Sequence, residues 1–265
     1  MRLLTRLLFA AGRFSSRVSV VLNYAACGTM SLADIKDGIR QSWEGFHSRE
    51  EDIATGLMEW ERDLVASFIR PGEAVLIVGA GSGRDVIPLV EQGCHVTGIE
   101  PAAAALGLAR NALRARRLPA TLIEGFLEDV EVPGRFDVVM FSYFSYSYVP
   151  EARRRIAALR KAASCLNSGG RILISYQFLP RPRALLIRVG RAAAAICRSD
   201  WRLEPGDHVA VQGSALQGYT HAFAEGEIER EAAAAGLDVV HHVRHPDPVA
   251  ALQLRKRDSL PNEQS

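Results

Sequence analysis

The residues best suited to binding chemistry form a glycine-rich segment directly after an apolar run. Gly79–Gly83 reads Gly-Ala-Gly-Ser-Gly and follows the expected strand Ala74–Val78. Alternating glycines allow a tight turn without side chains, so a ligand can approach the backbone closely. A helix is expected directly after the turn, and its N-terminus would point toward the same ligand. The segment therefore predicts a ligand-binding loop.

A carboxylate stands at the end of the next expected strand. Glu100 follows His95–Ile99 and precedes Pro101. A carboxylate in that place can accept hydrogen bonds from both hydroxyls of a ribose. A glycine turn or an acidic residue alone is a weak signal, but this order of strand, loop, helix, strand and acid predicts a nucleoside-binding pocket.

The spacing of the glycines separates two families of nucleoside binders. A dinucleotide fingerprint needs a small residue at its third glycine position, where Arg84 stands, so a nicotinamide-dependent reductase is disfavoured. The spacing G-x-G-x-G instead resembles the first motif of class I S-adenosylmethionine-dependent methyltransferases. Three later stretches are similar to motifs of the same family: Phe136–Val139 (FDVV), Leu166–Ile174 (LNSGGRILI) and His221–Leu237. The resemblance covers residues 43–257.

The resemblance implies an α/β fold: a Rossmann-like, seven-stranded, mostly parallel sheet with helices on both faces and an antiparallel last strand. It also implies S-adenosyl-L-methionine as cofactor. The candidate cofactor-binding residues are Gly79, Ala80, Gly81, Gly83, Asp85, Glu100, Pro101, Phe126, Leu127, Glu128 and Ser142. Ile77 departs from the family, which carries an acidic residue there to hold the methionine amino group. Either Asp85 or a bridging water would then replace that acid, or the affinity for the cofactor would be weaker.

Methyl transfer is an in-line displacement, so the protein mainly aligns the nucleophile, the methyl group and the sulfur, and removes a proton where the acceptor has one. The resemblance places the reacting centre beyond the strand Phe136–Phe141, where Ser142 and Tyr143 are the expected contacts. His221 and His47 are the candidate bases, although some methyltransferases rely on alignment alone. Aromatic and hydroxyl groups in this stretch suit a small, apolar or amphipathic acceptor.

The elements expected around these residues alternate between strands and helices, which predicts a mostly parallel sheet. The expected strands are 74–78, 95–99, 120–124, 136–141, 171–176, 237–243 and 249–254, and the expected helices are 50–69, 85–92, 102–117, 151–166 and 225–235. Residues 167–170 are expected to form a turn.

Two segments lie outside this alternation. Residues 1–42 form an N-terminal extension in which Arg2, Arg6, Arg13 and Arg17 share one side of a helical wheel. That helix could pack on the domain, cover the substrate, act as a targeting segment or contact an anionic membrane surface through residues 1–18. Residues 180–220 form an insertion with a second basic apolar helix and a hairpin; it is either a substrate lid or a structural excursion. Residues 258–265 are expected to form a disordered tail.

Composition narrows the classes of function. The chain has 265 residues, 48% of them hydrophobic, and a net charge of only +2, so nucleic acid is not an expected partner. No apolar run is long enough for a transmembrane helix, and four widely spaced cysteines fit a reduced, cytoplasmic and metal-free protein. The arginine-rich, lysine-poor composition favours a bacterial source. A non-catalytic or membrane-associated cofactor-binding module is the alternative to an enzyme; the oligomeric state is not readable.

Overall fold

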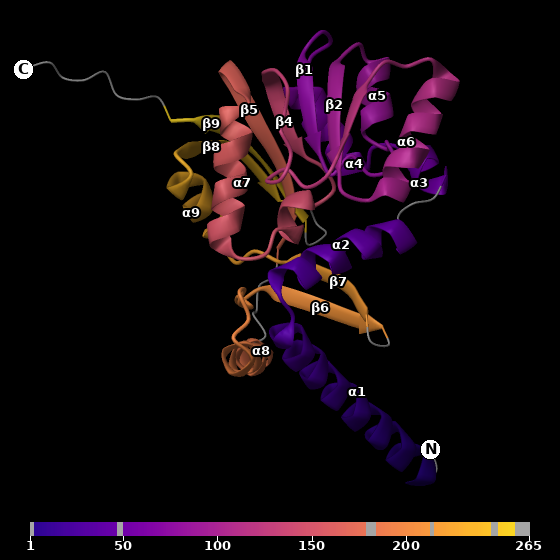
Figure 1. Cartoon of the computed structure of the whole chain (residues 1–265), viewed down its shortest axis with the longest axis vertical. Coiled ribbons are helices and arrows are strands. Elements are labelled where there is room, and N and C mark those ends of the chain that lie inside the picture. Colours follow the sequence, from indigo (N-terminus) through magenta and orange to yellow (C-terminus); the bar gives the residue numbers. More distant parts are fainter. Residues whose placement is uncertain (1–2, 47–49, 179–183, 213–214, 245–248, 258–265) are drawn as a thin grey trace, which may run out of the picture.

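The protein is built around a seven-stranded sheet with the strand order β3-β2-β1-β4-β5-β9-β8 (Figure 1). The computed structural model describes residues 3–46, 50–178, 184–212, 215–244 and 249–257, so His47 and the tail 258–265 lie outside the described residues. The strands are β1 (Ala74–Val78), β2 (His95–Glu100), β3 (Thr121–Glu124), β4 (Phe136–Phe141), β5 (Leu166–Gln177), β8 (Leu237–Arg244) and β9 (Val249–Lys256).

The directions of the strands match the expected plan. β3, β2, β1, β4 and β5 are mutually parallel, whereas β9 is antiparallel to both of its neighbours, β5 and β8. The prediction of a mostly parallel seven-stranded sheet with an antiparallel last strand is confirmed.

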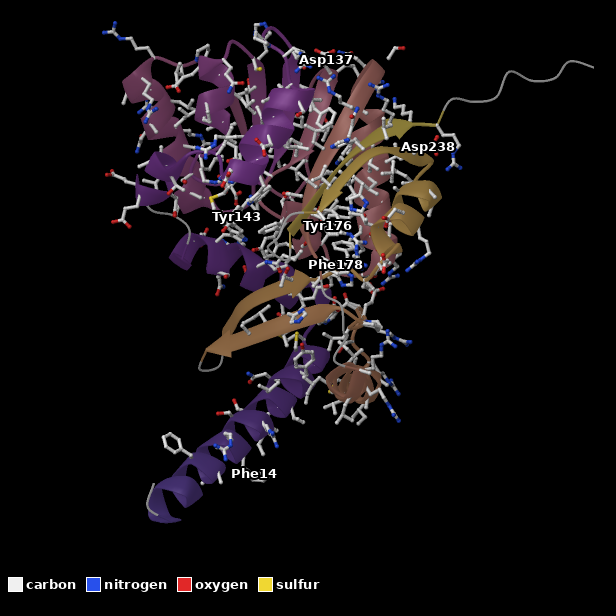
Figure 2. All side chains as sticks on the ribbon, turned by 180° about the vertical axis from the view of Figure 1, so that it is seen from behind. Phe14, Asp137, Tyr143, Tyr176, Phe178 and Asp238 are labelled. Atoms are coloured by element: carbon white, nitrogen blue, oxygen red, sulfur yellow. The ribbon has the colours of Figure 1, made fainter. Side chains whose placement is uncertain are left out.

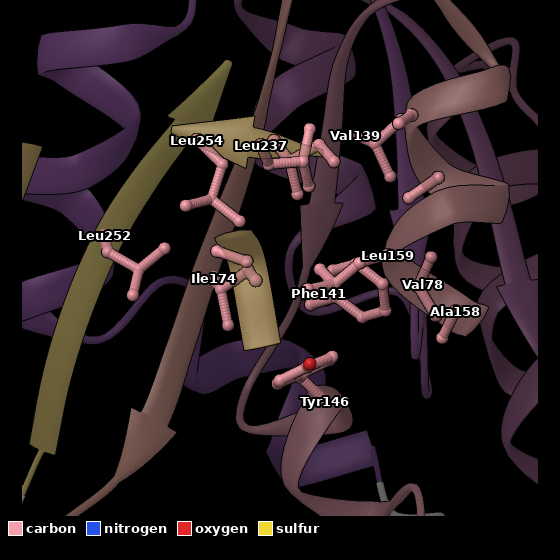
Figure 3. Packing of buried hydrophobic residues seen from close by; sticks show 14 of the residues in the cluster. Val78, Val139, Phe141, Tyr146, Ala158, Leu159, Ile174, Leu237, Leu252 and Leu254 are labelled. Carbon is pink, nitrogen blue, oxygen red and sulfur yellow. The ribbon is translucent and has the colours of Figure 1, made fainter. Parts of the chain in front are cut away.

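Helices cover both faces of the sheet because alternate residues of each strand point to opposite sides. Leu76 and Val78 of β1 belong to a core cluster under α7 (Ala152–Ser164) and α9 (Glu227–Ala234), part of which is seen in Figure 3. Val75 and Ile77 belong to a second cluster under α4 (Glu59–Phe68) and α5 (Val86–Glu91). Helix α6 (Ala103–Arg116) adds Leu113 to that second cluster.

Two expected elements differ from the structure. The helix expected over residues 50–69 is divided into α3 (Glu50–Thr55) and α4, because Gly56 between them takes a φ of +62°, outside the helical range. The turn expected over residues 167–170 is instead the start of β5, where Leu166 pairs with Phe136 before a register shift.

A cap of helices and a hairpin lies below the sheet in Figure 1. It consists of α1 (Leu3–Thr29), α2 (Leu32–Phe46), α8 (Ala184–Cys197) and the antiparallel pair β6 (Asp207–Gln212) and β7 (Ala215–His221). These elements share a third core cluster that includes Tyr24, Ile35, Ile187 and Trp201. The N-terminal extension and the insertion, far apart in sequence, thus pack into one unit.

Helices α1 and α8 cross at two glycines. A Cβ atom added to Gly28 would lie 2.1 Å from the carbonyl oxygen of Gly190, and one added to Gly190 would lie 2.1 Å from a methyl carbon of Leu203. The two backbones can approach this closely only because neither glycine carries a side chain. Among the described helices, none is both long enough and apolar enough to cross a membrane.

Candidate active site

A cavity of 410 Å³ lies at the carboxyl ends of β1, β2 and β4. Its size is within the range of small-molecule sites, and its position is where open α/β sheets bind ligands. The loops after β1, β3 and β4 form one part of its wall, and α2 and residues of the segment 52–58 form the other. The cavity is therefore enclosed between the sheet edge and the cap.

The glycine loop is held by its own hydrogen bonds. The amides of Gly79 and Ala80 both donate to the carbonyl oxygen of Ile99, at 2.9 and 3.0 Å, and the amide of Gly81 donates to Oε2 of Glu100 at 2.9 Å. These three donors are thus used within the protein. The loop offers a ligand room close to the backbone, not a set of free amides.

Gly79 and Gly81 of this loop both have a positive φ, which favours glycine, but only Gly79 also lies against a neighbouring side chain. Gly79 has a φ of +81°, and a Cβ there would lie 2.7 Å from Cβ of Ser145. Gly81 has a φ of +53°, and a Cβ there would meet no atom within 4 Å. Gly83 does not line the cavity; its missing side chain instead lets the loop pack on Ala109 of α6.

Glu100 is buried at the end of β2 and lines the cavity. Its Oε1 accepts the amide of Ala102 at 2.8 Å while Oε2 accepts that of Gly81. Burial raises the pKa of this carboxyl, and the two backbone hydrogen bonds partly oppose that rise. Each carboxylate oxygen can accept a second hydrogen bond, so Glu100 both anchors the loop and remains able to bind hydroxyl groups.

A buried charge cluster adjoins the loop where the usual acidic residue is missing. Ile77 lies in the core and does not line the cavity, whereas Asp85 does. Asp85 accepts a hydrogen bond from Ser142 and lies 2.8 Å from Arg84, whose guanidinium also binds Glu61 through two nitrogens. Burial raises the pKa of Asp85 to about 8, and the charge of Glu61 adds to the rise while Arg84 opposes it.

The wall formed by the segment after β3 is joined to the cap by Lys36 of α2. The ammonium of Lys36 lies 4.4 Å from the ring centre of Phe126 and 2.9 Å from Oε1 of Glu128. It also donates to Asp129. These contacts combine a cation–π interaction with two ion pairs, so they hold α2 over this side of the cavity. Leu127 is buried in the same wall.

Aromatic residues enclose the end of the cavity beyond β4. Trp43 of α2 makes edge-to-face contacts with Tyr143 and Tyr148, with ring centres 6.3 and 5.4 Å apart. Tyr143, labelled in Figure 2, also carries the guanidinium of Arg84 over its ring at 4.8 Å. Tyr143 and Phe144 have φ values of +40° and +66°, and such backbone strain in non-glycine residues often marks functional sites. Burial raises the pKa of Tyr148 well above its usual value.

His221 does not lie in this cavity. It is fully buried on β7, with one ring nitrogen 2.7 Å from Asp207 and the other 3.0 Å from Glu227. Burial alone would lower its pKa, but the hydrogen bonds to the two carboxylates raise it overall. A histidine held between two carboxylates and away from the cavity cannot take a proton from an acceptor, so the expectation that His221 is the base does not fit the structure.

The structure brings most of the predicted site together. The residues of the candidate set that line the cavity are Gly79, Ala80, Gly81, Asp85, Glu100, Pro101, Phe126, Leu127, Glu128, Ser142 and Tyr143. Sequence reasoning missed Lys36 and Ile39 of α2 as lining residues. Isoleucines 35 and 39 and Trp43 recur every four residues, which signals a buried helix face but not what that face covers.

Comparisons with known proteins agree with this fold. Residues 75–170 match a family model described as a methyltransferase domain. A protein of Geobacillus kaustophilus named an uncharacterised methyltransferase is 29% identical over 136 residues, which are 51% of this chain and 60% of that protein. This chain therefore spans about 60% of the length of that relative.

Two solved structures share the fold at low sequence identity. An S-adenosylmethionine-dependent methyltransferase from Clostridium acetobutylicum is 11% identical, with a TM-score of 0.56, and the match covers 75% of this chain and 90% of that one. The 1,6-didemethyltoxoflavin-N1-methyltransferase of Burkholderia thailandensis, solved with its substrate and S-adenosylhomocysteine, is 20% identical, with a TM-score of 0.55. That match covers 86% of this chain and 85% of the other.

Proposed function

We propose that this chain is a class I S-adenosylmethionine-dependent methyltransferase that transfers a methyl group from that cofactor to a small-molecule acceptor. The observation that carries the proposal is that one cavity is lined at one end by the glycine loop and Glu100 and at the other end by the aromatic residues beyond β4. One end has the groups suited to a nucleoside and the other has apolar surface for an acceptor.

The residues present fit the cofactor. Gly81 leaves open space where any other residue would place a Cβ, and Glu100 beside it has carboxylate lone pairs available for ribose hydroxyls. Asp85 lies close enough to the loop to replace the acid missing at Ile77 as the partner of the amino group. Phe126 and Leu127 supply the apolar wall for a flat base.

When bound, S-adenosylmethionine supplies an electrophilic methyl group on a sulfonium sulfur. Trp43, Tyr143 and Tyr148 would then position an acceptor with an oxygen, nitrogen or carbon nucleophile for in-line attack, and α2 would exclude water from that side of the cavity. Alignment of this kind can supply most of the acceleration of a displacement reaction. The Burkholderia structure, which holds 1,6-didemethyltoxoflavin and S-adenosylhomocysteine in the same fold, supports a small-molecule acceptor.

Binding of the cofactor is tested by isothermal titration with S-adenosylmethionine and S-adenosylhomocysteine. We expect Glu100→Ala to weaken binding by at least tenfold, since a charge-assisted hydrogen bond contributes roughly 1.5–3 kcal/mol. Glu124→Ala is the matched control, because Glu124 ends the neighbouring strand β3 in register with Glu100 but is exposed. Failure of the unaltered protein to bind either compound would overturn the proposal.

A non-catalytic cofactor-binding module is the second candidate, favoured by Ile77 in place of an acid. Incubation with S-adenosylmethionine carrying a radiolabelled methyl group, against a panel of planar amines, phenols and amphipathic compounds, separates the two. Labelled product in the presence of wild-type protein, and its loss in Glu100→Ala, supports the enzyme; binding without any labelled product supports the module. A parallel fluorescence titration with NADH is expected to show no complex, as Arg84 occupies the position where a reductase needs a small residue.

We also propose that the protein acts in the cytoplasm of a bacterium. Its four cysteines, all within the described residues, are free thiols, and three of them are buried. Free thiols of this kind are typical of a reducing compartment.

A further inference from the structure

Helix α1 extends well beyond the cap that its other end helps to form (Figure 1). Tyr24 and Cys27, near its C-terminal end, are buried in the cap, but every residue from 9 to 19 is exposed. Helices in proteins are stabilised mainly by packing of one face, and an unpacked segment of this length is marginal in water. This part of α1 therefore needs another surface to pack against.

The exposed part of α1 carries an apolar row. Phe14, Val18 and Leu22 follow one another at intervals of four residues, so they lie on one face of the helix. Their exposed fractions are 71%, 40% and 60%, and Figure 2 shows Phe14 on the part of the helix that extends from the body. Solitary exposed apolar residues are common, but a regular row of them indicates an interaction site.

The charge of the same segment identifies the kind of partner. Arg13 and Arg17 are exposed and lie one turn apart on a different side of the helix from the apolar row. The first acidic residue of the chain is Asp34, so the helix has no carboxylate of its own with which to pair. In a pair of α1 helices from two copies, these like charges would repel, whereas an anionic surface would attract them.

We propose that α1 lies in the headgroup layer of an anionic lipid bilayer. Phe14, Val18 and Leu22 insert at the boundary of the acyl chains, and Arg13 and Arg17 bind lipid phosphates. An apolar face beside basic residues is the pattern of a helix that lies on a membrane without crossing it. The cap, which α1 continues, and the cavity beneath it would be held near the bilayer surface.

Co-sedimentation of the full chain with phosphatidylcholine vesicles, with and without phosphatidylglycerol, tests the proposal. We expect strong partitioning only onto the anionic vesicles. An arginine near an anionic surface contributes about fivefold in affinity, so Arg13→Gln with Arg17→Gln should weaken partitioning roughly thirtyfold. Phe14→Ser with Leu22→Ser should weaken it more than tenfold.

Matched controls exclude effects of net charge and of general hydrophobicity. Arg110→Gln with Arg114→Gln removes an exposed pair with the same spacing from α6, and Val240→Ser removes an exposed apolar residue from β8; both should partition like wild type. Unchanged S-adenosylhomocysteine binding by every variant shows that the body remains folded.

Three results of the vesicle experiment would overturn the proposal: equal binding to neutral and anionic vesicles, wild-type partitioning by the arginine variant, or no binding at all. A dimer in light scattering that dissociates in Phe14→Ser would also overturn it, since a second copy would then cover the apolar row.

Discussion

The ion pair between Arg84 and Glu61 links the cavity to helix α4, and Glu61→Gln tests what it contributes. Glutamine keeps the shape of the side chain and can still accept the amide of Met58, which donates to Glu61 at 2.9 Å. The charge is lost, and the amide nitrogen that replaces Oε1 can no longer accept the hydrogen bond from Nη2 of Arg84. Breaking a fully buried ion pair costs about 3–5 kcal/mol.

The expected cost here is smaller, because Arg84 is partly exposed and keeps Asp85 as a partner, which ionises more easily once the charge of Glu61 is removed. The side chain of Arg84 is 13% exposed, and Asp85 remains 2.8 Å from the guanidinium. We therefore expect Glu61→Gln to lower the free energy of unfolding by about 2 kcal/mol, which for a chain of this size lowers Tm by about 6 °C.

The same substitution should change the pH dependence of stability. The pKa of Asp85 is raised to about 8, first by burial and then by the charge of Glu61. Because the folded state binds this proton more tightly than the unfolded state, the contribution of Asp85 to stability is complete below its usual pKa of about 4 and is lost as the pH rises toward 8. Removing the charge of Glu61 lowers the pKa of Asp85, so the variant loses less stability over that interval.

Urea unfolding at pH 6 and pH 8 measures both effects. The deficit of Glu61→Gln should be smaller at pH 8, and in an Asp85→Asn background it should not change with pH. Glu59→Gln, an exposed position on the same helix, is the control and should stay within about 0.5 kcal/mol of wild type. The reasoning fails if Glu61→Gln is as stable as this control, or if its deficit is the same at both pH values.

Three further substitutions test the loop, the wall and the cap. Gly81→Val places a side chain in the open space of the cavity, so titration calorimetry should show loss of S-adenosylhomocysteine binding. Because Gly81 has a φ of +53°, urea unfolding should also show that the free energy of unfolding falls by about 1–2 kcal/mol. Lys36→Met keeps the aliphatic stem but removes the ion pairs and the cation–π contact, and should weaken cofactor affinity about fivefold in the same titration. Gly28→Ala should lower the free energy of unfolding by at least about 2 kcal/mol, while Gly12→Ala on the same helix, with no atom within 4 Å, should stabilise slightly; equal effects in urea unfolding would contradict the close crossing.

The sequence was most informative where local chemistry decides the structure. The strands 74–78 and 136–141 were predicted with the bounds that the structure has, since short apolar runs bounded by turn residues leave few alternatives. The helix expected over residues 50–69 failed at Gly56, where Arg84 donates to the glycine carbonyl at 2.8 Å. That contact joins two loop residues that lie 28 positions apart in the chain, so helical periodicity could not show it.

The residues of the candidate site also divide into those that the local sequence could reveal and those that it could not. The glycine loop and Glu100 could be found because the turn and the strand end that position them lie next to them in sequence. The burial of His221 between Asp207 and Glu227 could not, because a histidine in a core network and one in a cleft have the same local sequence pattern. Ion pairs in a folded core depend on which elements meet, and periodicity says nothing of that.

The contact between α1 and α8 shows why the cap was the least predictable part. Gly28 and Gly190 stand far apart in the chain, and each looks like an ordinary helix-weakening glycine in its own helix. Their function appears only when the two backbones cross, because a methyl group at either position would overlap the opposing segment. A glycine leaves no hydrophobic or charge pattern in the sequence, yet its missing side chain is what allows the N-terminal helix and the distant insertion to pack into one unit.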